Sequence, residues 1–301
     1  MRTVSDSSVC HRLICVGAEG QIVRNRKLAA RMVLVSVLTP VSAVALLAVL
    51  VLAFSGWYRF ALALGLVAGL VVTVSRMLRN PPDGRVLAES DDPELFAVVD
   101  RLCAIGDMPR PELVLSDQAQ PNSWVVHLPK RKPRVYLTKG LRELLTLEEL
   151  QAVLAHEQTH IANRDALVMS VIALPGLTMM NSRGAAGAFA NLAGALSHTG
   201  TLALSRYREL AADAGAAAIT GRPSALASAL LKVSDSQRRI PSKDLRSAAA
   251  LNAFNLVAVD QRSRWWHRSR LLARVTATHP PLEERLEALH TLERIQQQSG
   301  V

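Results

Sequence analysis

An uncharged apolar run near the N-terminus constrains this chain more than any other feature. Residues 32–58 contain no charged side chain, and the run is longer than the roughly 20 apolar residues that a transmembrane helix needs. After Arg59, residues 60–75 form a second uncharged run. The link between the two runs carries a tryptophan and a tyrosine, which suit a membrane surface. Residues 31–80 are therefore predicted to form a transmembrane helical hairpin.

The distribution of charge predicts how this hairpin is oriented. The chain carries 35 Lys and Arg against 25 Asp and Glu, a formal net charge of +10. Basic residues precede the first run and follow the second, whereas the link holds only Arg59. Because positively charged flanks stay in the cytoplasm, we expect a multi-pass protein of the cytoplasmic membrane. Residues 1–30 are then a polar N-terminal segment, and the chain beyond residue 80 starts on the cytoplasmic side.

The composition excludes several other classes of protein. Half of the residues are hydrophobic and three are cysteine, which excludes a disordered chain, collagen and a disulfide-stabilised mini-protein. A weaker apolar stretch at residues 166–205 is rich in small residues, which permit close helix contact. It predicts either a second, thin membrane hairpin or a helical hairpin on the protein surface.

The pattern beyond residue 80 predicts a small sheet followed by helices. Apolar residues at helical spacing predict a helix over residues 91–105. Runs of β-forming residues predict three strands, the second of them at an edge, over residues 112–116, 123–128 and 134–138. Thr146 and Glu149 match a capping box, which predicts a helix over residues 147–162.

This last helix carries a His-Glu-x-x-His motif. His156 and His160 are four residues apart and lie on one helix face, so both imidazoles can reach one metal ion. Glu157 can reach a metal-bound water instead of the metal. Zinc lowers the pKa of such a water toward 7, and the glutamate can take its proton. Chance occurrence of the pattern is the alternative, but a well-capped helix favours a zinc site.

A catalytic zinc site needs a third protein ligand and one open position. Glu209 and Asp213 are one helical turn apart and project together. Glu209 can bind the metal while Asp213 accepts a hydrogen bond from a ligating imidazole. A solvent-exposed acidic helix face would account for the same pair, so the spacing alone leaves both interpretations open.

The order of these motifs resembles the HtpX-type membrane zinc metalloproteases, which are relatives of the CaaX prenyl proteases. The chain shares two early apolar spans, the motif at residues 156–160, a Ser-Arg-x-x-Glu-x-x-Ala-Asp sequence at residues 205–213 and a His-Pro-Pro sequence at residues 279–281. The resemblance implies a mainly α fold. It would be a membrane-anchored, gluzincin-like zinc metalloprotease domain over residues 81–301, with a small β-sheet and two to four transmembrane helices.

The resemblance also implies roles for individual residues. Glu209 would be the third zinc ligand and Asp213 would support a ligating imidazole. Asp165 matches the acidic position that follows the zinc helix in this family. His279 would stabilise the oxyanion, and Arg285 would support it or a site carboxylate. A residue that precedes a proline-started helix is the alternative explanation of His279.

The family carries an Asn-Ala-Phe segment on its substrate-binding strand. The corresponding residues here are Asn122, Ser123 and Trp124. They continue as Val-Val-His, where the family usually has a small residue and a glycine. An extended substrate could pair with this edge by strand addition.

These features together predict a zinc endopeptidase with one Zn²⁺ per chain. Glu157 would act as base and then as acid during hydrolysis of misfolded or membrane-associated proteins, a role in protein quality control. The expected partners are polypeptide substrates and the lipid bilayer, with no nucleic acid and no particular oligomeric state indicated. Arginine and tryptophan alternate over residues 262–270, which suits lipid headgroups or single-stranded nucleic acid. A catalytically silent membrane scaffold or adaptor and a membrane-tethered nucleic-acid binder are the rival functions.

Overall fold

The computed structural model describes four long segments of the chain. They are residues 83–127, 131–165, 204–239 and 279–299. The model also describes Leu256, short strands within residues 10–23 and isolated positions within residues 41–72. Apart from these positions, the predicted hairpin at residues 31–80 lies outside the described residues, as do residues 166–203 and 262–270. Among the helices that are described, none is long and apolar enough to cross a membrane.

Three short strands lie in the polar N-terminal segment. They are β1 (Cys10–His11), β2 (Ile14–Val16) and β3 (Ile22–Val23), and they pair antiparallel in that order. The sequence predicts no strand here, because runs of two or three residues are too short to display an alternating pattern.

The predicted small sheet is present and has four strands. They are β4 (Arg85–Val86), β5 (Glu112–Ser116), β6 (Ser123–Val126) and β7 (Arg134–Thr138), in the order β4-β5-β7-β6. β5 and β7 are parallel, and the other two pairs are antiparallel. The bounds of β5 and β7 are those predicted, and β6 is two residues shorter than predicted. Within the described part of the chain, β6 forms an edge of this sheet.

Helix α5 (Leu147–Ala162) has the predicted bounds and the predicted capping box. The Thr146 hydroxyl accepts from the backbone N–H of Glu149, and the Glu149 carboxylate accepts from the backbone N–H of Thr146. The same carboxylate accepts from Ser228 Oγ at 2.7 Å and from Lys232 Nζ at 2.8 Å. Because both donors belong to α8 (Pro223–Arg239), Glu149 sets the start of α5 and joins it to α8.

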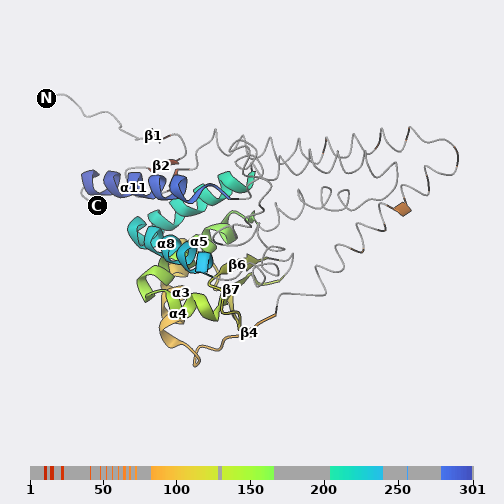
Figure 1. Cartoon of the computed structure of the whole chain (residues 1–301), viewed down its shortest axis with the longest axis horizontal. Helices are drawn as coiled ribbons and strands as arrows, with labels where there is room; N and C mark the ends of the chain where they lie inside the picture. The colour runs from red at the N-terminus through yellow and green to blue at the C-terminus, as the bar shows by residue number, and fades with distance from the viewer. Residues whose placement is uncertain are drawn as a thin grey trace.

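The other helices surround α5 and the sheet. They are α3 (Pro93–Gly106), α4 (Lys139–Leu144), α11 (Leu282–Ser299) and the helical residues 204–220. Figure 1 shows α11, α8 and α5 beside one another, with β6 and β7 next to α5 and with α3 and α4 below. The larger hydrophobic core lies between the sheet and these helices. The buried side chains of α5 also include the polar ones of His156, Glu157 and His160.

Candidate metal centre

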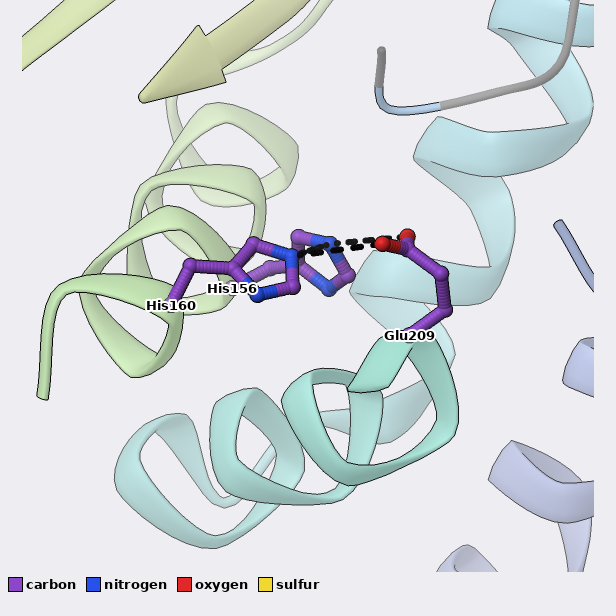
Figure 2. Close-up of side chains that lie close together, drawn as sticks. All are labelled: His156, His160 and Glu209. Atoms are coloured by element: carbon purple, nitrogen blue, oxygen red, sulfur yellow. Dashed lines mark hydrogen bonds and ion pairs between the residues drawn. The ribbon is translucent and has the colours of Figure 1, made fainter. Parts of the chain in front are cut away.

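His156 and His160 of α5 meet Glu209 of the facing helix in a buried cluster. The two imidazole Nε2 atoms are 3.1 Å apart. Each of them lies 3.6 Å from an oxygen of the Glu209 carboxylate. Figure 2 shows both rings directed from α5 toward this carboxylate. Two nitrogens and one carboxylate oxygen therefore converge on one point, as in the His₂Glu ligand sets of catalytic zinc sites.

A glycine lets the two helices approach closely enough for this convergence. Gly215 is one of the helical residues 204–220, and it faces Thr159 of α5, the residue before His160. A Cβ atom at position 215 would lie 2.6 Å from both Cγ2 and Oγ1 of Thr159. The absence of a side chain at Gly215 thus keeps Glu209 within reach of the histidines.

We expect Gly215→Ala to destabilise the protein and to weaken zinc binding. Overpacking costs about 1–3 kcal/mol, which exceeds the gain of at most about 1 kcal/mol in helix propensity from Gly to Ala. Thermal unfolding and zinc titration of the purified protein measure the two effects. Thr159→Ala in the same chain should recover much of both. A Gly215→Ala variant that is as stable as the unchanged protein would contradict this account of the helix contact.

Two carboxylates hold the outer nitrogens of the histidine rings. Asp213 Oδ1 lies 3.0 Å from His156 Nδ1, and Asp165 Oδ2 lies 2.7 Å from His160 Nδ1. Asp165 reaches His160 because α5 ends at once and Arg164 adopts a positive φ of 56°, which turns the chain back. With a carboxylate beside its Nδ1, each ring keeps Nε2 for a metal ion.

The N-terminal region of α11 closes the other side of the cluster. Arg285 donates two hydrogen bonds to Asp213, from Nε at 2.7 Å and from Nη2 at 2.6 Å. His279 Nδ1 lies 3.4 Å from Glu209 Oε2, and Arg285 Nη1 lies 3.8 Å from the same oxygen. The structure thus brings both of these sequence-predicted residues to the metal ligands.

Sequence reasoning missed Arg208. Its guanidinium is buried, and its Nη2 lies 2.7 Å from Glu209 Oε1. Arg208 precedes Glu209 in the sequence, and an arginine beside a glutamate on a helix usually indicates a solvent-exposed face. The signal that could have found it is the alanine-rich sequence that follows Glu209, which indicates a helix packed closely on its neighbours.

Burial and neighbouring charges shift the pKa values of the three ligands. Burial disfavours a charged imidazole, but the neighbouring carboxylates of Asp213 and Glu209 outweigh it and raise the pKa of His156 to about 9. Burial opposes ionisation of Glu209, yet the charges of Arg208 and His279 hold its pKa well below the usual value. Burial and the charge of Arg208 together lower the pKa of His160.

The charges around the cluster fit a divalent cation. Among the described residues, the site buries two guanidinium groups, those of Arg208 and Arg285. It also buries four carboxylates, those of Glu157, Asp165, Glu209 and Asp213. Metal binding requires both imidazoles to be neutral, and in that form the arrangement lacks two positive charges, the charge of one Zn²⁺. Glu209 Oε2 is buried and accepts no well-formed hydrogen bond from the described residues. The ligand types, the missing charge and this oxygen all suit a zinc ion.

The three residues of the predicted substrate-binding strand lie in different surroundings. Ser123 Oγ donates to Glu157 Oε1 at 2.6 Å, next to the metal ligands. Trp124 stacks on Tyr136 with ring centroids 5.1 Å apart, in a separate apolar cluster. Asn122 Oδ1 accepts from the backbone N–H of Leu256 at 3.2 Å. Of the three side chains, that of Ser123 touches Glu157.

A His-Glu-x-x-His helix that faces a glutamate ligand defines the zincin class of metallopeptidase site. Residues 89–293 match the model of Peptidase family M48, so the chain belongs to this family. This match confirms the resemblance to the HtpX-type metalloproteases. The chain is therefore a metallopeptidase by family, and its buried His156, His160 and Glu209 could hold the metal ion.

Individual relatives agree with the family match. Protease HtpX homolog 1 of Streptomyces coelicolor is 37% identical over 287 residues, which cover 88% of this chain and 92% of the relative. Protease HtpX homolog of Moorella thermoacetica is 36% identical over 242 residues, covering 73% of this chain and 78% of the relative. Among solved structures, the crystal structure of S. mikatae Ste24p has a TM-score of 0.45 at 16% identity, covering 77% of this chain and 57% of that chain.

Proposed function

We propose that this protein is a zinc-dependent membrane endopeptidase that hydrolyses misfolded or membrane-associated polypeptides. The observation that carries the proposal is the buried convergence of His156, His160 and Glu209, surrounded by an excess of two negative charges. Membership of Peptidase family M48 supports peptide-bond hydrolysis as the reaction. A silent scaffold is not favoured, because it has no need of a glutamate at position 157 beside a metal ligand.

Each residue of the site has a distinct part in this reaction. A zinc ion held by His156, His160 and Glu209 would supply a Lewis acid that makes water nucleophilic near neutral pH. Glu157 takes the proton of the attacking water and returns it to the leaving amine. His279 lies on the side of Glu209 away from Arg208, where it can stabilise negative charge that develops on the carbonyl oxygen.

Arg285 acts through Asp213 and orients His156. Its two hydrogen bonds fix the carboxylate that contacts Nδ1 of this imidazole. The substrate would bind as an extended strand along β6, the sheet edge nearest to Glu157. The pairing places a peptide bond beside the zinc ligands without requiring a particular side chain.

The chemistry is tested by proteolysis and metal analysis together. The full-length protein, purified in detergent, is expected to contain one zinc per chain and to cleave an unfolded polypeptide. A chelator should stop cleavage, and added zinc should restore it. A preparation that contains no zinc, or that cleaves equally well with chelator, would overturn the proposal. Binding of single-stranded nucleic acid without either activity would favour the nucleic-acid binder.

The membrane part of the proposal rests on the apolar runs at residues 32–58 and 60–75. Large apolar side chains at described positions within them are exposed, 72% for Leu52 and Phe60 and 71% for Leu64, as suits contact with lipid. The charge of the flanking residues predicts that the catalytic domain lies on the cytoplasmic side.

We expect residues 83–165 and 206–301 to lie on the same side of the membrane, because His156, His160 and Glu209 converge. Reporter fusions after Asn80 and after Val301 measure this directly, and both should report the cytoplasm. Reporters on opposite sides of the membrane would refute this topology.

A further inference from the structure

The hydrogen bond between Ser123 and Glu157 joins the edge strand to the zinc helix. Ser123 Oγ donates to Glu157 Oε1 at 2.6 Å, and both side chains are buried. A serine hydroxyl has one proton to donate, so this contact engages Oε1 and leaves Oε2 for another partner.

The backbone of Ser123 is directed away from β7, toward the side of β6 that pairs with no other strand among the described residues. Next to it, the carbonyl of Asn122 accepts from the N–H of Thr138 in β7 at 3.0 Å. Hydrogen-bonded and non-hydrogen-bonded pairs alternate in an antiparallel ladder. Ser123, which lies opposite Leu137, therefore directs its N–H and C=O away from β7.

We infer that Ser123 is a positioning residue that orients Glu157 for proton transfer. The inference rests on the proposed function. The hydroxyl fixes Oε1, so Oε2 faces the attacking water.

The test compares Ser123→Ala with a matched control. Ser228→Ala removes the other serine-to-glutamate hydrogen bond of α5, from Ser228 Oγ to Glu149 Oε1 at 2.7 Å, outside the site. We expect Ser123→Ala to lower kcat about tenfold through misorientation of the base, with zinc content, KM and thermal stability unchanged. Ser228→Ala should leave kcat unchanged. Ser123→Thr, which keeps the hydroxyl, should retain most of the activity.

A spectroscopic measurement tests the contact without relying on turnover. Infrared difference spectra between the unchanged protein and Glu157→Gln identify the carboxylate bands of Glu157. These bands should shift in Ser123→Ala and stay in place in Ser228→Ala.

Two kinds of result overturn the inference. One is a Ser123→Ala variant with unchanged kcat or unchanged Glu157 bands. The other is a variant that loses zinc or thermal stability in parallel with kcat, since that pattern indicates a merely structural role. Failure of the proposed function is recognised separately, because the unchanged protein would then show no chelator-sensitive cleavage, while the infrared bands still report the contact.

Discussion

Glu157→Gln is expected to keep one zinc ion per chain and to lower kcat by about two to four orders of magnitude. Glutamine has nearly the shape of glutamate and can still accept from Ser123, but its amide cannot take a proton from water. The side chain is buried next to His156 without being one of the three converging ligands. Cleavage rates and metal content of the purified variant measure the two effects.

Glu149→Gln is the matched control for this variant. Glu149 is another buried glutamate of α5, and it bonds Ser228 and Lys232 of α8, away from the metal ligands. Its replacement should lower thermal stability and leave kcat nearly unchanged. Unchanged proteolysis by Glu157→Gln would refute the role of Glu157 as the base.

Glu209→Ala is expected to lose most of the bound zinc. The substitution removes one of three ligands, and it leaves the buried charge of Arg208 facing the metal position without the carboxylate that it contacts. Asp213→Ala and Asp165→Ala are expected to weaken zinc binding about 10–100-fold, since each removes the carboxylate that orients one imidazole. Both variants should still bind zinc when the metal is in excess.

Metal analysis of the three purified variants separates ligands from supporting residues. A Glu209→Ala variant that keeps stoichiometric zinc, together with an Asp165→Ala variant that loses it, would contradict the assignment of the third ligand. The same result would also remove the basis for transferring the family's ligand set to the helix that carries Glu209.

The sequence predicts those parts of the structure that depend on neighbouring residues. Helix α5 is predicted with its bounds because Thr146 and Glu149 form the capping box locally. His156 and His160 are predicted as a pair because helix geometry places them on one face. The strands β5 and β7 are likewise predicted by local runs of β-forming residues bounded by turns.

Contacts between distant segments could not be predicted from the residues alone. Taken alone, the pair Glu209 and Asp213 is more typical of a solvent-exposed helix face, and the family resemblance was needed to assign it to the metal site. The different surroundings of Ser123 and Trp124 follow from the pairing of β6 with β7, which decides the face of the sheet that each side chain occupies. Arg208 was missed for the same reason, since its burial and the 3.4 Å contact of its Nη1 with Nδ1 of His160 in α5 arise only once the helices are packed.

Zinc titration of the chelator-treated, full-length protein tests the central claim most directly. Cleavage of an unfolded polypeptide is followed while zinc is added in known amounts. The account predicts no cleavage before addition, a linear rise, and saturation at one zinc per chain, with His156→Ala inactive throughout. Cleavage that persists without metal, or that saturates only at several zinc ions per chain, would contradict a single catalytic site formed by His156, His160 and Glu209.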